Sequence, residues 1–530
     1  MCSRALATAS QIANRKPPSA FTAKATGIDW RERRMTGNFA LLVHAMPCTV
    51  STRKTNVGCT AIVPAALGPC AINTITAEHA ASTTFAMGAM LGRLATQLKM
   101  PRPGAYSAPD EYDLGPTVVN ERGRPAAVVL GESLTALATV RALAGGQVQV
   151  FSASSGQSES TRYSRLCRTL KRPMEHGNSV DSVEWLTEFC GSLAQPPVVI
   201  PTSDADALWL ARNEVALRPW CRYSNASFAD MLRIVSKDGL YAAALQADVP
   251  VVPSLSEPSM AELEAWSLAN AAPYLLKPFY NHIATCKLRR KNLLIDDRAA
   301  LLRYVDREGP RSLIVQRKLD GGDGFILDCY GLCNAGGIPV AMASHRRLRQ
   351  SPPNFGSTCF GEIPMGGSGT LEAKLFEYTN RLVRHLGYHG IFGVEWLHEP
   401  ITGELFLIDF NARPFSSIGH LVDSGLNLPM LAYRELIGEN LDELRPTPSL
   451  EHLFWMDVCS DLQTLRARNN LGWFEWMRSL LKCGSFAVWD SNDPGPWLHL
   501  TGKALGVYLG NRIGRRPPRN QSRPSFEETP

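Results

Sequence analysis

The stretch "FLIDFNARPFSS", residues 406–417, places Asp409 and Asn411 at the end of an apolar run and follows them with Arg413. It closes a longer segment, "GIFGVEWLHEPITGELFLIDFNARP", residues 390–414, in which apolar and polar residues alternate on both sides of a glycine-containing turn. Alternation of this kind predicts a β-hairpin with one apolar face and one polar face. The expected fold and the expected site both follow from this hairpin.

The turn of the hairpin decides which side chains face each other. Residues 401–403 are expected to form a three-residue loop, with its glycine in the left-handed conformation. The resulting register places Glu395 opposite Asp409, and Asn411 then projects from the same face. The other face of the hairpin is expected to carry the apolar side chains of Val394, Ile408 and Phe410.

These three polar residues predict a metal site. Cross-strand neighbours lie roughly 4.5 to 5.5 Å apart at Cβ, so two carboxylates and a carboxamide oxygen converge. Two like charges this close favour a cation between them, and oxygen ligands favour a hard ion such as Mg²⁺ or Mn²⁺. The alternative is an exposed hairpin whose acids are incidental.

Several cations accompany the predicted metal site. Lys277 directly follows a short apolar strand, which favours an anion as its partner over a solvated position. Metal ions and positioned cations are what stabilise phosphoryl transfer, and arginine binds phosphate or carboxylate through two nitrogens at once. The arginines expected to contribute are Arg413 and, in "HRRLRQ", Arg346, Arg347 and Arg349.

The ordered part of the chain begins with a predicted βαβ unit. Residues 126–130 read as a strand, 134–143 as a helix and 148–151 as a second strand. Gly131 stands alone where a dinucleotide site needs G-x-G-x-x-G, which argues against NAD or FAD. A further strand, "PPVVIPTSD", ends at Asp204, either a helix N-cap or a ligand at the carboxyl edge of the sheet.

Composition excludes several classes of protein. The 530 residues suggest about three or four domains, and 45% hydrophobic with 20% charged residues is ordinary globular material. A net charge of +6 without an RNA or DNA motif gives no indication of nucleic acid. Thirteen cysteines without a C-x-x-C pair suggest neither zinc nor disulfides and favour the reducing cytoplasm. No apolar stretch of membrane-spanning length occurs, and no secretory signal is evident.

The N-terminal segment differs from the rest of the chain. Only three acidic residues occur before position 100, and hydrophobic periodicity is weak. We expect residues 1–122 to be a basic extension of low order. A targeting peptide, a disordered extension and a start codon placed too early, with Met87, Met90 or Met100 as the true start, all fit this composition.

An ordered series of motifs between about Pro125 and Gly438 resembles the ATP-grasp superfamily. Within it, the chain is most similar to the bacterial carboxylate-amine ligases, such as D-aspartate ligase, and to the carbamoyl-phosphate synthase large chain. The motifs that carry the resemblance are "PTSDADALWLARN", "SKDGLYAAALQADVPVVPS", "LLKPF", "VQRKLDGGD", "RRLRQSPPNFGS" and "GVEWLHEPITGELFLIDFNARPFSS".

The resemblance implies a role for each matching residue. Glu395, Asp409 and Asn411 match the magnesium ligands, and Lys237 and Lys277 match the lysines that touch the phosphates of ATP. The adenine hinge matches Gln316, Arg317, Lys318 and Leu319, and Asp323 matches the acid near the ribose. Arg347 resembles the cation at the γ-phosphate or acyl phosphate, and Arg413 the one that steadies the intermediate.

The resemblance also implies an architecture and a reaction. The fold is α/β, with two α+β subdomains that grip ATP over residues 231–445. A Rossmann-like pre-ATP-grasp domain precedes them over residues 123–230, and a helical segment with a disordered tail follows over 446–530. The implied enzyme uses ATP and Mg²⁺ to activate a small carboxylate as an acyl phosphate, which an amine then converts to an amide. A homodimer is the default expectation.

Three departures from the family pattern keep alternatives open. Asp409 and Gln316 replace more usual glutamates, so the Gln316 amide must be oriented to accept from the adenine amino group. The segment "PFYNHIATC", residues 278–286, lacks the glycines of the usual phosphate-covering loop and leaves that task to His282, Thr285 and Lys287. The rivals are an enzyme that activates bicarbonate as carboxyphosphate and a catalytically idle nucleotide-binding regulator.

Overall fold

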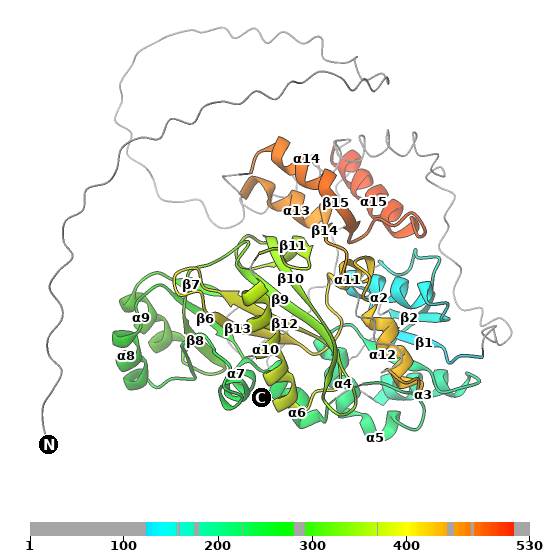
Figure 1. Cartoon of the computed structure of the whole chain (residues 1–530), viewed down its shortest axis with the longest axis horizontal. Coiled ribbons are helices and arrows are strands. Elements are labelled where there is room, and N and C mark those ends of the chain that lie inside the picture. The colour runs from blue at the N-terminus through cyan, green and yellow to red at the C-terminus, as the bar shows by residue number, and fades with distance from the viewer. Residues whose placement is uncertain are drawn as a thin grey trace, which may run out of the picture. The chain divides into compact units, whose positions relative to one another are not determined.

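The structure is a computed structural model that describes residues 123–154, 156, 160–173, 180–224, 226–279, 292–367, 369–441, 450–467 and 471–512. The extension expected over residues 1–122 and the tail expected after residue 512 lie outside these ranges. The described residues form an α/β fold of three β-sheets with helices packed on their faces (Figure 1).

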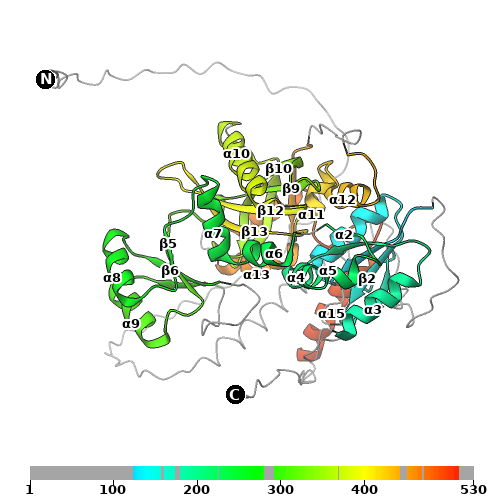
Figure 2. The same ribbon diagram turned by 90° about the horizontal axis from the view of Figure 1, so that it is seen from below.

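The first sheet has four parallel strands in the order β3-β2-β1-β4. The predicted βαβ unit is confirmed, since β1 pairs in parallel with β2 and with β4. Val128 and Leu130 pack with α3 on one face, and Ala127 and Val129 pack with α2 on the other (Figure 2). Burial on both faces is typical of a parallel sheet. The elements are β1 (Ala127–Leu130), α2 (Leu134–Gly145), β2 (Val150–Ser154), β3 (Arg168–Lys171), α3 (Val180–Gly191), β4 (Val198–Pro201), α4 (Asp204–Arg212) and α5 (Glu214–Leu217).

A small antiparallel sheet has the strand order β5-β8-β6-β7. Tyr274 and Leu276 of β6 pack with Val315 of β8 against two helices, α8 and α9, which cover one face of this sheet (Figure 1). Strand alternation turns Lys277 and Gln316 to the opposite face. The elements are β5 (Ser254–Ser256), α8 (Met260–Ala269), β6 (Tyr274–Pro278), β7 (Leu293–Ile295), α9 (Arg298–Glu308) and β8 (Leu313–Arg317).

The large sheet has seven strands in the order β13-β12-β9-β10-β11-β14-β15. Val394 and Phe410 lie on one face, in a core cluster that includes residues of α6, α7 and α10. Tyr330 and Ile391 lie on the other face, where α11 and α12 pack. The elements are α6 (Phe228–Val235), α7 (Lys237–Gln246), β9 (Ile326–Cys333), β10 (Pro339–Ser351), β11 (Ser357–Ile363), α10 (Gly369–Leu386), β12 (Gly390–His398), β13 (Leu405–Asn411), α11 (Ile418–Asp423) and α12 (Leu428–Leu436).

Residues 446–530 were expected to form a helical segment with a disordered tail, and the described part of this segment is not helical throughout. It also contributes β14 and β15, which extend the large sheet beyond β11. Four-residue strands give too short an apolar pattern to be told from a helical turn, so the prediction was wrong at these two strands. The elements are β14 (Leu453–Met456), α13 (Val458–Thr464), η1 (Leu465–Ala467), α14 (Trp473–Lys482), β15 (Cys483–Phe486) and α15 (Gly495–Arg512).

Within the described ranges, every helix is too short or too polar to cross a lipid bilayer.

Candidate active site

The hairpin of β12 and β13 brings together the three residues predicted to bind metal. Glu395 pairs with Asp409 in the ladder, as predicted, and Asn411 pairs with Gly393. The Asn411 amide nitrogen donates to Glu395 Oε1 at 3.1 Å and to the Gly393 carbonyl at 3.3 Å. These bonds occupy the nitrogen side of the carboxamide, so its oxygen remains the side that can act as a ligand.

The predicted register is correct, but the predicted turn is not. Glu399 pairs with Glu404 through a backbone hydrogen bond of 2.9 Å, which makes the loop four residues long, 400–403. A β-bulge between Leu407 and Asp409 then adds one residue to β13 and restores the Glu395–Asp409 pair. The extra residue is Ile408, which lines the site cavity and does not lie on the apolar face as expected.

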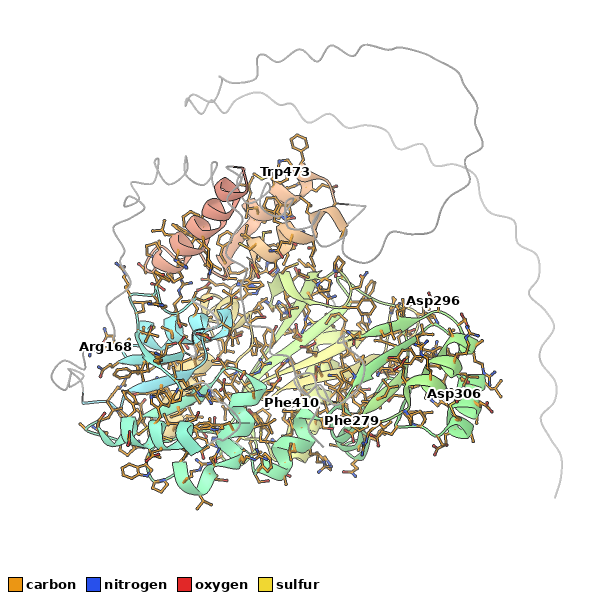
Figure 3. The ribbon with its side chains drawn as sticks, turned by 180° about the vertical axis from the view of Figure 1, so that it is seen from behind. Arg168, Phe279, Asp296, Asp306, Phe410 and Trp473 are labelled. Atoms are coloured by element: carbon orange, nitrogen blue, oxygen red, sulfur yellow. The ribbon has the colours of Figure 1, made fainter. Side chains whose placement is uncertain are left out.

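Two lysines lie beside the carboxylates. Lys237, the first residue of α7, donates to Asp409 Oδ2 at 2.8 Å, and its backbone N–H bonds to the Phe279 carbonyl at the end of β6. Helix α7 therefore joins the small sheet to the large sheet, near the places where Figure 3 labels Phe279 and Phe410. Burial opposes the charge of Lys237, but the Asp409 carboxylate, together with Tyr241 and Glu395, outweighs it and raises the pKa of this lysine.

Lys277 of β6 is only 6% exposed. Burial, followed by repulsion from the Lys237 ammonium, lowers the pKa of Lys277 to about 7, and Asp409 and Glu395 only partly offset this. A lysine in this state gains a full charge when an anion such as a phosphate arrives beside it.

Arg347 of β10 reaches one of the predicted metal ligands, Glu395. One of its terminal nitrogens lies 2.8 Å from Glu395 Oε1 and 2.6 Å from Asp328 Oδ1, while its Nε bonds to Asp328 Oδ2 at 3.0 Å. Asp328 is fully buried and also contacts His345 Nδ1 at 2.7 Å and the Tyr330 hydroxyl at 3.2 Å. Burial disfavours its charge, but Arg347 and His345 together hold the pKa of Asp328 at about 2. The Asp328 carboxylate thus clamps the Arg347 guanidinium in position beside Glu395.

The other two arginines of "HRRLRQ" do not reach this site. Arg346 lies 3.6 Å from Glu362 and bonds to the Gly366 carbonyl. Arg349 is held by Asp461 of α13 at 2.6 Å, in a buried pair that Trp476 also joins. The expectation that both supply cations to the phosphates is wrong. Arg346 is adjacent to Arg347 and so projects from the opposite face of the strand, and the bulge after Arg347 turns Arg349 to that opposite face as well.

Arg413 is anchored to the parallel sheet. Its Nε bonds to Asp204 Oδ1 at 2.8 Å, and its Nη1 bonds to the Pro414 carbonyl at 2.9 Å. The N-cap of α4 is Ser203, which accepts from the Asp206 backbone, so Asp204 is not the cap. The carboxyl edge of the parallel sheet therefore holds an arginine of the predicted site in place.

A cavity lies beside these charged groups. Its lining includes Lys277, Arg347 and Glu395 and, from β8 and the residues after it, the predicted hinge residues Gln316, Arg317, Lys318 and Leu319. Asp323 lines a neighbouring cavity, where it accepts from Gln350 at 3.1 Å and from the Asn354 backbone at 3.2 Å. The predicted loop residues His282, Thr285 and Lys287 lie outside the described residues.

The oxygen ligands of Glu395, Asp409 and Asn411 fit a magnesium ion. In the part of the chain that the structure describes, no three His, Cys, Asp or Glu side chains converge on one point, so the candidate set is two carboxylates and a carboxamide. Such a set suits Mg²⁺, which typically takes one or two carboxylates and completes its shell with phosphates and water. The residues present therefore fit the metal together with a nucleotide.

The solved structures most informative for comparison are ligases and carboxylases. The chain is similar to a pyruvate carboxylase from Rhizobium etli with acetyl coenzyme-A (TM-score 0.48, 16% identity), over 62% of this chain but only 32% of that one. It is similar to an L-amino acid ligase from Bacillus licheniformis (TM-score 0.46, 14% identity, 61% and 78%). It is also similar to an N5-carboxyaminoimidazole ribonucleotide synthetase with ADP (TM-score 0.48, 14% identity, 62% and 81%).

No known family profile and no curated protein matches the sequence. Because these TM-scores lie below 0.5, the argument for function rests on the residues of the site.

Two residues of the site were missed at the level of sequence. Asp328 carried a signal, since it is a lone acid inside the apolar run "FILDCYG" and a charged residue in a buried strand needs a partner. Tyr241 carried only a weak one, its position one helical turn after Lys237. Both residues support neighbours that the motifs did identify.

Proposed function

We propose that this protein is an ATP-dependent ligase that activates a carboxylate as an acyl phosphate and joins it to an amine. The observation that carries the proposal is a cluster of charged and polar side chains in which Glu395, Asp409 and Asn411 meet Lys237 and Arg347. Glu395, Arg347 and Lys277 also line the cavity. Carboxylates alone would repel a triphosphate, whereas this mixture of oxygen ligands and cations suits a nucleotide phosphate bound with a metal.

Each charged residue of the site has a role in the proposed reaction. Lys237 and Lys277 neutralise phosphate oxygens, and the clamped Arg347 fixes the transferred phosphoryl group where charge develops. Arg413, held by Asp204, steadies the acyl phosphate. Mg²⁺ or Mn²⁺ held by Glu395, Asp409 and Asn411 would lower the repulsion between the carboxylate nucleophile and the triphosphate.

The proposed reaction has two steps and needs no reagent besides ATP, the carboxylate and the amine. A carboxylate oxygen attacks the γ-phosphorus, the bond to ADP breaks, and an acyl phosphate forms. The amine nitrogen then attacks the carbonyl carbon, inorganic phosphate leaves, and the amine loses a proton. Both substrates are small molecules on this proposal, and neither nucleic acid nor a membrane takes part.

The proposal extends to the architecture and the location of the protein. We assign the parallel sheet within residues 123–230 as a Rossmann-like pre-ATP-grasp domain, because Asp204 at its carboxyl edge holds Arg413. The ATP-grasp domain spans residues 231–445. All eight cysteines in the described ranges are free thiols, which fits a reducing cytoplasm.

The test is phosphate release from ATP and Mg²⁺, screened over a matrix of carboxylates and amines with bicarbonate as a separate arm. Release that requires one carboxylate and one amine, and that is lost in Asn411→Ala, supports the ligase. Release that depends on bicarbonate supports the carboxyphosphate alternative instead. ATP binding without turnover in any arm contradicts the ligase and supports a nucleotide-binding regulator.

A further inference from the structure

The apolar part of the cavity is a slot whose walls include Leu275, Leu319, Ile326 and Ile408. Two buried amides also line the cavity, Gln316, which is 3% exposed, and Gln350, whose amide nitrogen already donates to Asp323. On the proposed function, on which this inference rests, the slot takes the purine base of ATP. The Gln316 amide is then the side chain that meets the edge of the base.

The protein itself decides which end of that amide faces the slot. The Tyr241 hydroxyl donates to the Ile408 carbonyl at 3.0 Å, and a carbonyl can only accept. Tyr241 has a single hydroxyl proton, so its oxygen is left as an acceptor toward Gln316. The Gln316 Nε2 atom lies 3.4 Å from that oxygen and donates to it. The amide nitrogen is thereby held by Tyr241, and Oε1 becomes the end that is offered to the base.

The bulge in β13 makes this chain of bonds possible. Ile408 is the extra residue of the bulge, and the bulge interrupts the regular pairing of β13 with β12 at this residue. Its carbonyl accepts from Tyr241, which lies one helical turn after Lys237 on α7 and reaches the same strand. One helix face therefore serves both ends of the nucleotide: Lys237 at the phosphates and Tyr241 at the base.

We propose that Tyr241 is a positioning residue that makes the site select a 6-aminopurine over a 6-oxopurine. With Oε1 directed into the slot, Gln316 accepts from the amino group of adenine. The same oxygen would face the carbonyl oxygen of guanine or hypoxanthine, where two acceptors repel. A freely rotating glutamine amide could turn its nitrogen to the 6-oxopurine and bind it as well. The hydroxyl of Tyr241 removes that choice.

Binding of MgATP and of magnesium inosine triphosphate to the full chain tests the proposal by calorimetry. These nucleotides carry the same triphosphate and differ at the edge of the base. The wild-type chain is expected to bind ATP about tenfold or more tightly, because a buried acceptor without a donor costs roughly a factor of ten in affinity. In Tyr241→Phe the ratio of the two dissociation constants is expected to fall to within about threefold of unity.

A double variant separates orientation from a merely structural role. In Tyr241→Phe with Gln316→Glu, both oxygens of the new carboxylate accept, so no hydroxyl is needed to orient it, and the preference for ATP should return. A general loss of packing at Tyr241 would not be repaired in this way. Gln316→Met removes the acceptor while keeping similar bulk, and it should abolish the preference in a chain that still has Tyr241.

Several results would overturn the proposal. These are equal binding of both nucleotides by the wild-type chain, an unchanged ratio in Tyr241→Phe, no recovery in the double variant, and a preserved preference in Gln316→Met. The last measurement decides the matter even if Tyr241→Phe does not fold. Binding of neither nucleotide would overturn the proposed function as well, whereas ATP binding without ligase turnover leaves this test fully informative.

Discussion

Lys277 is a buried lysine beside a second cation, and its charge has opposite consequences for folding and for binding. Its pKa is lowered to about 7 in the folded chain, from 10.5 for an ordinary lysine. Between these two values the unfolded chain binds more protons than the folded one, so this group makes stability rise with pH from about 7 to about 10.5. Below pH 7 the buried Lys277 destabilises the folded chain by its full amount, and this group no longer makes stability depend on pH.

Lys277→Met is therefore expected to stabilise the free protein by about 2 kcal/mol or more at pH 6 to 7 and to weaken MgATP binding. The gain should shrink toward pH 10, which urea unfolding at several pH values would show. The matched control is Lys237→Met. Its lysine has a raised pKa because of Asp409, contributes stability below pH 10.5, and should destabilise the chain when removed. Destabilisation by both variants would contradict this account.

At the scale of elements, β10 carries two buried ion pairs with different tasks. Arg347 pairs with Asp328 behind the site, and Arg349 pairs with Asp461 of the C-terminal segment. In both pairs the arginine bonds through Nε and a terminal nitrogen, and both acids are fully buried. A bulge at Leu348 separates the two arginines. The structure thus supplies its own comparison between a clamp at the site and a purely structural pair.

Asp328→Asn and Asp461→Asn are each expected to cost about 3 to 5 kcal/mol, because each removes the fully buried carboxylate that binds a buried arginine through two nitrogens. Only Asp328→Asn should also weaken MgATP binding, since Arg347 loses the support that fixes it toward Glu395. Chemical denaturation and calorimetry, performed where both variants remain folded, separate the two effects. An equal loss of affinity in both variants would show that stability alone is responsible.

The hairpin of β12 and β13 shows what the sequence could predict at this scale. Alternation identified both strands and the face that carries Glu395 and Asp409. The loop was predicted one residue too short and the bulge at Ile408 was not predicted, and these two errors cancel in the register. No residue type marks a bulge in the sequence, because a bulge depends on the element that packs against the strand. Here that element is α7, whose Tyr241 hydroxyl donates to the Ile408 carbonyl.

At the scale of the whole molecule, the sequence predicted the parallel sheet but missed the strands of the C-terminal segment. Its strands β14 and β15 are four residues each and become recognisable only beside β11. Asp493 links the same segment to the parallel-sheet region, where it bonds to Arg141 at 3.0 Å and to Ser164 at 2.8 Å. Pairings across some 350 positions leave no local pattern to detect.

The C-terminal segment should therefore couple the unfolding of the parallel sheet to that of the large sheet. Asp493 is fully buried, and Asp493→Ala leaves Arg141 without its main partner, at a cost of about 3 to 5 kcal/mol. Scanning calorimetry is expected to show one transition in the wild-type chain and a broadened or divided one in the variant. The control is Asp490→Ala, whose carboxylate lies 3.7 Å from the same arginine and is 31% exposed. A pair of that kind is worth less than about 1 kcal/mol, so this variant should keep the single transition. Equal effects of the two variants would mean that the segment does not hold the two sheets together through Asp493.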